Sequence, residues 1–424
     1  MNNCNKQNGK IELIDEKTLI VGVDIGSNDE YARLFTWRKI ELSKMAFHFT
    51  NDITGFESFH AWVVKVMKSN NMNKVIVGME PTSIYWEPLA TYCKNNGMIV
   101  VHVNPAAVKK SKELDDNDPS KNDRKDPKVI AGLVAEGRYQ FPFMPEERYA
   151  ALRELSNLRL RTKKSLCQAT NRLERWYARY FPEFKTAYKD SNAKTAMLIL
   201  EDHPLPSDIV ALGEEGILKI WREHKVRGAG KTRARKLYEA AERSVGRTEA
   251  PNVARMEFRT IMEDVKRYQQ RLDEIEQAVD EILPTVKNVE KLLEIPGVGK
   301  ATVLTFLAEV GDISRFKSAK EIQKLAGLAI VTNESCKHKG ATCISYRGRK
   351  RLRWVLYEVA LSLIGKNKEF NQVHQYYTTR EKNPLKGIQS VVAVACKVIR
   401  IFYKLLTTGV SYDGTKMTMD IVRA

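Results

Sequence analysis

The sequence has no run of eighteen apolar residues, which is about the length that a membrane-spanning helix needs. Its first ten residues are polar and lack the apolar core of a signal peptide. The six cysteines are scattered over 424 residues without a CxxC pair, which favours reduced thiols over a disulfide framework. These absences predict a cytoplasmic protein with no membrane partner.

The front third of the chain also lacks any excess of positive charge, although the whole chain carries +18. Residues 1–147 contain 19 basic and 20 acidic side chains, so residues 148–424 carry a net charge of +19. Lysine and arginine bind polyanions strongly because they displace counterions condensed on phosphates. The asymmetry therefore predicts a nucleic-acid partner for the rear of the chain.

The front third, residues 1–147, alternates strand-like and helix-like segments. The pattern predicts a mixed sheet with helices packed on it, and hence an α/β domain. The expected strands are Leu19–Val23, Arg33–Arg38, Met45–Thr50, Val75–Gly78 and Met98–Val103, and the expected helices are Gly55–Ser69, Ile84–Asn95 and one that starts near residue 126.

Four carboxylates occupy places where such a sheet would bring them together. Asp24 ends the first strand and Glu80 ends the fourth, whereas Asp123 and Asp126 lie three residues apart at the start of the last helix. Carboxylates gathered at one sheet edge repel unless a cation neutralises them, and hard oxygen ligands select Mg²⁺ or Mn²⁺. Two such ions could clamp the attacking and leaving oxygens of a phosphodiester.

The middle block, residues 148–285, carries an unbroken heptad of apolar residues that predicts a coiled coil. A looser stripe on the preceding helical segment offers an antiparallel partner. The pair could form a helical hairpin within one chain or an arm for dimerisation. The heptad consists of Phe258, Ile261, Val265, Tyr268, Leu272, Ile275, Val279 and Ile282, and the looser stripe of Leu152, Leu155, Leu166, Ala169, Leu173 and Trp176.

The same block mixes Trp176, Tyr177 and Tyr180 with arginines 172, 175 and 179. Aromatic and basic side chains together suit contacts with bases and with a nucleic-acid backbone. A packed helix with a solvated basic face would have the same composition. The sequence leaves both interpretations open.

The last block, residues 286–424, is predicted to be mostly helical. The turn at 295–299 contains two glycines and precedes Lys300 and an apolar helix. Such a helix-hairpin-helix turn exposes backbone N–H groups that, with Lys300, could bind a phosphate.

Together these motifs resemble the DEDD transposases of bacterial and archaeal insertion sequences, the RuvC-like recombinases guided by a bridge RNA. The resemblance covers nearly the whole chain. In front it rests on the segments at 21–26, 78–83 and 121–126, which match the D, E and DxxD motifs in order. Behind, it rests on Ile295–Gly299, Ala308–Asp312, Leu325–Leu328 and Ile344–Gly348 with Leu352 and Arg353.

The resemblance implies an RNase H-like (RuvC-like) first domain, a helical coiled-coil middle and a C-terminal transposase domain with a serine nucleophile. The matching serine is Ser335, with Ser345 as the alternative. This chain departs from the family at Cys336, Arg349 and Pro127, where glycine, asparagine and alanine are usual. The residues 337–353 include no acid, and their cations would hold the scissile phosphate: Lys337, Lys339, Arg347, Arg349, Lys350, Arg351 and Arg353.

The resemblance further implies that donor and target DNA are cut and rejoined through a serine–DNA intermediate. It implies Mg²⁺ or Mn²⁺ at the acidic cluster, a guide RNA, a homo-oligomer (dimer or tetramer) and a place near the nucleoid of a prokaryote. Two alternatives use the same residues. One is a RuvC-type, structure-selective endonuclease that uses water; the other is a non-catalytic nucleic-acid-binding protein.

Overall fold

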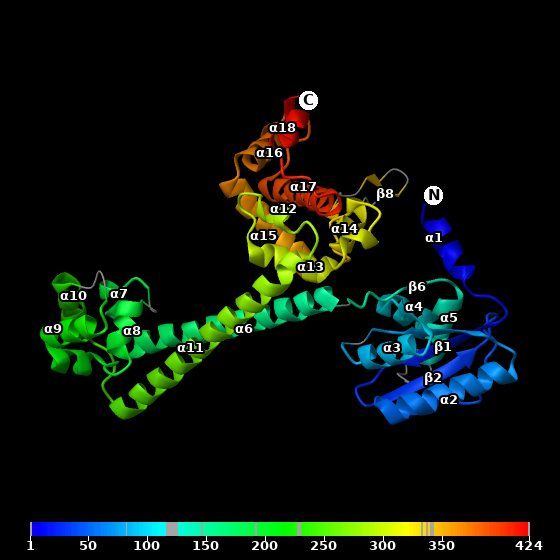
Figure 1. Ribbon diagram of the computed structural model, residues 1–424, viewed down its shortest axis with the longest axis horizontal. Helices are drawn as coiled ribbons and strands as arrows, with labels where there is room; N and C mark the ends of the chain where they lie inside the picture. Colours follow the sequence, from blue (N-terminus) through cyan, green and yellow to red (C-terminus); the bar gives the residue numbers. More distant parts are fainter. Residues whose placement is uncertain are drawn as a thin grey trace. The chain divides into compact units, whose positions relative to one another are not determined.

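The computed structural model describes residues 2–81, 83–115, 126–145, 147–190, 193–226, 230–331, 334–335, 338–339 and 343–422, with only the backbone described at 2–6, 113–115, 334–335, 338–339 and 420–422. The chain divides into two compact units, Met1–Met144 and Pro145–Ala424, called here the N-terminal and C-terminal units (Figure 1). No helix in the described ranges combines the length and apolarity needed to cross a bilayer. Three domains ending at residues 147, 285 and 424 remain a prediction.

The N-terminal unit is built on one six-stranded mixed sheet, so the predicted α/β architecture is confirmed for this part of the chain. Its elements are α1 (Asn2–Ile11), β1 (Thr18–Asp24), β2 (Asp29–Phe35), β3 (Phe47–Thr50), α2 (Ile53–Ser69), β4 (Lys74–Met79), α3 (Trp86–Asn95), β5 (Ile99–Val103), α4 (Pro105–Asp115), α5 (Asp126–Ala135) and β6 (Tyr139–Gln140).

The strand order across the sheet is β3-β2-β1-β4-β5-β6. Strands β1, β2 and β3 pair antiparallel, β4 and β5 join parallel to β1, and β6 closes the edge antiparallel to β5. The second strand was predicted at Arg33–Arg38 but begins at Asp29. The prediction was wrong because Asp29 and Glu30 are charged and resemble a turn, although Glu30 is fully buried in the strand.

Helices cover both faces of this sheet. On one face, alternate residues of β1 such as Leu19 and Val21 form a core with α2 and α3. On the other face, Ile20 of β1 and Ile76 of β4 form a core with α4 and α5. Residues of β1 with even numbers therefore face α5.

Two glycines let helix α5 lie directly on the sheet. Gly22 of β1 pairs with Gly78 of β4 across the parallel ladder, so together they form a flat patch. A Cβ atom at Gly22 would stand 1.9 Å from the carbonyl oxygen of Pro127, and one at Gly78 would stand 2.4 Å from Val134. The absence of two side chains thus brings the first turn of α5, which begins at Asp126, close to the end of β1.

We expect Gly22→Ala to destabilise the docking of α5 by about 3 kcal/mol, because the clash is with backbone that can move only if the helix moves. Hydrogen exchange of the α5 amides, measured by mass spectrometry, should become much faster. The control is Gly132→Ala in the same helix, where an added Cβ meets nothing within 4 Å. That variant should slow exchange slightly, because alanine favours helix by about 0.5–1 kcal/mol. Equal exchange in both variants would contradict the tight contact.

The C-terminal unit is mostly helical over its described residues, as predicted. Its elements are α6 (Glu147–Tyr180), α7 (Phe184–Ala187), α8 (Lys194–Leu200), α9 (Pro206–Glu223), α10 (Lys231–Glu242), α11 (Pro251–Ile282), η1 (Leu283–Thr285), α12 (Glu290–Leu293), α13 (Lys300–Val310), η2 (Ile313–Arg315), α14 (Ala319–Leu325), β7 (Ile330–Val331), β8 (Glu334–Ser335), β9 (His338–Lys339), β10 (Cys343–Ile344), α15 (Lys350–Lys366), α16 (Lys368–Thr379), α17 (Gly387–Thr408) and α18 (Thr415–Val422).

The long helices α6 and α11 lie side by side within one chain (Figure 1). Most heptad positions of α11 are buried, including Phe258, Val265 and Val279. At one end the pair packs with helices α7, α8, α9 and α10 around an aromatic core. At the other end it packs against the core formed by the elements from α12 to α18.

Candidate functional site

Asp24 and Glu80 lie at one edge of the sheet in the N-terminal unit. They follow Val23 and Met79, which pair with each other in the parallel ladder of β1 and β4. Asp24 comes two residues after Gly22, and Glu80 two residues after Gly78. Both glycines lie against α5, so the alternation of side chains along a strand directs both acids toward the α5 face. Both are partly buried.

Asp126 joins this edge because the glycine patch draws in the first turn of α5. Its side chain is only 13% exposed and forms an ion pair with Lys112 of α4. Burial raises the pKa of Glu80, the ammonium of Lys112 lowers it, and the carboxylate of Asp126 raises it further. Glu80, Asp126 and Lys112 therefore interact electrostatically at the sheet edge.

Glu30 of β2 is a buried acid that sequence reasoning missed. It is 0% exposed, and neither of its carboxylate oxygens has a hydrogen-bond partner among the described residues. Burial, together with the negative charge of Asp24, raises its pKa to about 8. Glu30 is therefore mostly protonated at neutral pH. Only the even spacing of Glu30, Ala32 and Leu34 in β2 could have indicated that it points into the core.

The fourth predicted acid, Asp123, lies outside the described residues. Within the described ranges, no group of three or more His, Cys, Asp or Glu side chains comes close enough to hold a metal ion. The carboxylates of Glu80 and Asp126 nevertheless suit a hard divalent cation, because two half-buried negative charges share one ammonium group, that of Lys112. No sequence pattern marked Lys112 as part of this edge.

Ser335, the predicted nucleophile, lies in the short strand β8, which pairs with β9 so that Ser335 is opposite His338. Only the backbone of Ser335 and Lys339 is described, and Cys336 and Lys337 lie outside the described residues. Ser345, the alternative, follows β10, and its N–H donates to the carbonyl oxygen of Ala329 at 2.8 Å. Both serines thus belong to the hairpins between α14 and α15.

The segment after Ser345 is held tightly against the end of α14. Gly327 has a φ of +71°, and the N–H of Tyr346 donates to its carbonyl oxygen at 3.1 Å. A Cβ atom at Gly348 would stand 2.4 Å from the nitrogen of Gly327. The two glycines that match the family pattern therefore serve a close backbone crossing.

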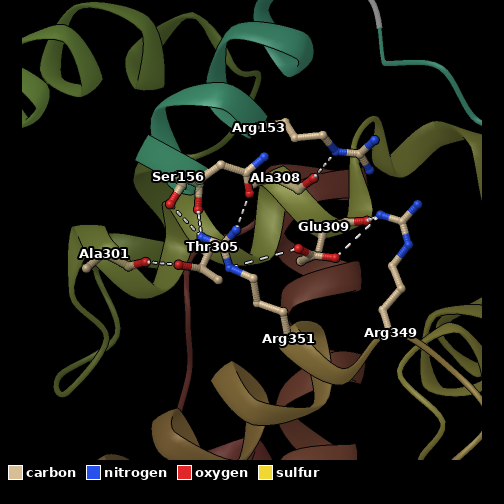
Figure 2. A network of polar contacts seen from close by, with 9 residues as sticks. Arg153, Ser156, Ala301, Thr305, Ala308, Glu309, Arg349 and Arg351 are labelled. Carbon is tan, nitrogen blue, oxygen red and sulfur yellow. Dashed lines mark hydrogen bonds and ion pairs between the residues drawn. The ribbon is translucent and has the colours of Figure 1, made fainter. Parts of the chain in front are cut away.

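Arg349 and Arg351, predicted to hold phosphate, bind other parts of the protein (Figure 2). Arg351 donates to the carbonyl oxygen of Ser156 at 2.6 Å and to its Oγ at 2.5 Å. Arg349 donates to the carbonyl oxygen of Glu309 at 2.5 Å, and the Glu309 carboxylate lies between the two guanidinium groups. Burial lowers the pKa of both arginines. This network fastens the start of α15 to α6 and α13.

The remaining predicted phosphate contacts differ in their surroundings. Arg353 donates to the carbonyl oxygens of Ala326 at 3.0 Å and Tyr346 at 3.3 Å, so it supports the same crossing. Lys300 is exposed and forms an ion pair with Asp280 at 2.6 Å. Arg347 and Lys350 are exposed. Among the predicted phosphate-binding cations whose side chains the structure describes, a phosphate could reach Lys300, Arg347 and Lys350 without breaking a buried contact.

The aromatic residues of α6 face the core. Trp176 and Tyr177 are 2% and 1% exposed, and the indole N–H of Trp176 donates to the carbonyl oxygen of Ala254 at 3.0 Å. Tyr180 is also buried. The idea that these rings contact bases was wrong, because they form the aromatic cluster that joins α6 to α11. Spacing by three and four residues would have indicated this burial.

Two family profiles match the chain. One, named for the DEDD transposases of IS110 and described as a transposase, matches residues 21–182, and the other, described as the transposase IS116/IS110/IS902 family, matches residues 289–377. The first includes Asp24, Glu80 and Asp126, and the second includes both candidate serines.

Several known proteins are similar. The insertion element IS116 uncharacterized 44.8 kDa protein of Streptomyces clavuligerus is 26% identical over 68% of this chain and 71% of its own length. The transposase for insertion sequence element IS1111A of Coxiella burnetii is 25% identical over 51% of this chain and 59% of its own length. The pilin gene-inverting protein of Moraxella bovis is 30% identical over 29% of this chain, and the match spans only 38% of that protein.

Proposed function

The chain belongs to the DEDD-type transposases of the IS110 family, and from this premise we propose that it cuts and rejoins DNA strands with a serine nucleophile beside an acidic, metal-binding cluster. The family places it among DNA transposases and recombinases. The observation that carries the proposal is that Glu80, just after β4, interacts with Asp126, beside the end of β1 where Asp24 lies, inside the matched span.

We infer that the N-terminal unit has an RNase H-like fold. Three antiparallel strands followed by two strands parallel to the first support this inference. In such a sheet the end of the central strand and the end of its parallel neighbour lie at one edge. Asp24 and Glu80 occupy these two positions.

Mg²⁺ or Mn²⁺ would be held by Glu80 and Asp126, which already interact, and by Asp24 and Asp123 once these acids close around the ion; the described acids do not by themselves form a three-ligand cluster. Bound there, a divalent ion would polarise the phosphate and stabilise the leaving oxygen. Lys112 offsets part of the negative charge when the carboxylates are close together, since it pairs with Asp126.

The proposed chemistry at Ser335 is a phosphoryl transfer. The Ser335 hydroxyl attacks the phosphorus, a Ser–O–P bond forms, the bond to one DNA oxygen breaks, and the serine proton ends on the departing DNA hydroxyl. A DNA hydroxyl from another strand then attacks the same phosphorus and restores the serine. Arg347 and Lys350, which are exposed and flank the hairpins, would bind the phosphate and offset its charge.

The partners follow from the same premise. The DNA substrate would bind near the serine hairpins, while a guide RNA would lie along the exposed cations of α6, which include Arg161, Lys163 and Lys164. In the resembled family the serine of one subunit meets the acids of another. We therefore propose a homo-oligomer, and the packed, heptad-bearing pair of α6 and α11 as its coiled-coil arm.

We expect Ser335→Ala to abolish the covalent protein–DNA adduct, since alanine has no hydroxyl to form the ester. The adduct would be measured by denaturing gel electrophoresis after incubation with Mg²⁺, RNA and labelled DNA. Ser345→Ala is the matched control and should retain the adduct. If only Ser345→Ala loses it, Ser345 is the nucleophile.

Two other outcomes would decide between the alternatives. Cleavage that persists in both serine variants without any adduct would support a RuvC-type nuclease that uses water. No cleavage by the unmodified protein with Mg²⁺, RNA and DNA together would support a binding protein without catalysis.

A further inference from the structure

A cavity of about 290 Å³ lies near the end of the C-terminal unit, beyond both spans that the family profiles match. Helix α17 forms one wall, and the segment from Val410 to α18 forms the other. The chain reverses at Gly409, whose φ is +70°, and the side-chain amide of Asn288 donates to the carbonyl oxygen of Leu406 at 2.9 Å beside this turn. The Lys397 ammonium donates to the carbonyl oxygen of Met417 at 3.2 Å, so α18 is tied back onto α17.

The cavity combines an apolar floor with a cationic rim. Leu405 and Met417 are buried and form part of the floor. Its lining includes four cations, Lys397, Arg400, Lys404 and Lys416, and one carboxylate, Asp413. The lining is therefore strongly positive.

The four cations divide into two that have partners within the protein and two that have none among the described side chains. Lys416 pairs with Asp413 at 3.3 Å, and Lys397 binds a carbonyl group. Arg400 and Lys404 are exposed, and neither has an ion-pair or hydrogen-bond partner among the side chains that the structure describes. They lie four residues apart on α17 and so project from the same face of the helix. This arrangement offers two free cations above an apolar surface.

A nucleotide satisfies both parts of this site. Its phosphate is an anion for Arg400 and Lys404, and its base has a flat apolar face for the cavity floor. The row from Lys397 to Lys404 runs about 10 Å along the helix, which is long enough for more than one phosphate. A duplex would present its phosphates but would keep its bases stacked away from the cavity.

We propose that this cavity binds an unpaired nucleotide of a nucleic-acid strand, with the phosphate on Arg400 and Lys404 and the base against Leu405 and Met417. The proposal rests on the proposed function only in that the partner is a nucleic acid. Its test requires no catalysis, so it can fail while strand cleavage stands, and the reverse also holds.

The test fills the cavity without changing its charge. Val410 lines the cavity and is 46% exposed, so Val410→Trp should block the base. The matched control is Val245→Trp, at a valine that is 83% exposed in another loop of the same unit. The full-length protein would be titrated, by fluorescence anisotropy, with a short labelled single strand of DNA, the same strand in RNA, and a duplex of the DNA sequence.

We expect Val410→Trp to weaken single-strand binding about tenfold and to leave duplex binding within about twofold, while Val245→Trp changes neither. Competition with a free nucleoside monophosphate separates the two sources of this chemistry. Effective competition would assign the cavity to a single nucleotide, whereas binding by the strand alone would assign it to a strand. Equal single-strand binding by the two tryptophan variants, or an equal loss for strand and duplex, would overturn the proposal.

Discussion

Replacing Glu80 with glutamine is expected to lower the rate of DNA strand cleavage at least about a thousandfold, which corresponds to roughly 4 kcal/mol in the activation barrier. Glu80 and Asp126 interact electrostatically at the sheet edge, and burial already disfavours the charged form of Glu80. A divalent cation would stabilise the charged form of a carboxylate that is partly buried beside another acid. The amide of glutamine has nearly the same shape but carries no charge to bind one.

The matched control is Asp29→Asn, which changes another acid of the same sheet. Asp29 begins β2 at the same end of the sheet, but its side chain is 58% exposed and binds His48 at 2.7 Å, so it is solvated whereas Glu80 and Asp126 are partly buried. That variant should cleave at nearly the wild-type rate. Binding of Mn²⁺, measured by calorimetry without DNA, provides a readout independent of activity and should weaken only in Glu80→Gln. Cleavage by Glu80→Gln within about tenfold of wild type would refute a catalytic role for this carboxylate.

The sequence predicted the parts of this edge that local patterns control. Apolar runs that stop at Asp24 and just before Glu80 indicated strand ends, and strand ends in a parallel pair meet at one edge. The ion pair between Lys112 and Asp126 depends on how α4 and α5 pack, which no spacing along the chain reveals. Gly22 and Gly78 can be read from the sequence, but only the register of β1 and β4 shows that the two glycines pair.

The basic segment around residue 350 shows the same limit. It contains no acid from residue 337 to residue 353, so the sequence alone indicates cations without acidic partners nearby. The groups that bind Arg349 and Arg351 come from Glu309 and from Ser156, far away in sequence. Only the fold showed that two of these arginines join helices. For the phosphate contacts of the proposed chemistry, this favours Arg347 and Lys350 over Arg349 and Arg351, which are partly buried and already have partners.

Glutamine in place of Glu30 is expected to remove most of the loss of stability of the N-terminal unit at alkaline pH. Burial raises the pKa of Glu30 from 4.5 to about 8, so the folded state holds a proton that the unfolded chain releases above pH 4.5. The stability that this group contributes is complete below pH 4.5 and is lost as the pH rises through about 8. The loss amounts to roughly 5 kcal/mol between pH 4.5 and pH 8, of which roughly 3 kcal/mol falls between pH 6 and pH 9.

Two neighbouring groups bear on this prediction. Asp24 adds a negative charge that disfavours ionisation of Glu30, while burial raises the pKa of Cys93 in α3 to about 12. Hydrogen exchange of β1 and β2 at pH 6 and pH 9, corrected for intrinsic rates, would measure the effect. The wild-type strands should lose protection at pH 9, and those of Glu30→Gln should lose little. Equal loss in both proteins would show that another group causes the alkaline destabilisation and that Glu30 is not held protonated at the start of β2.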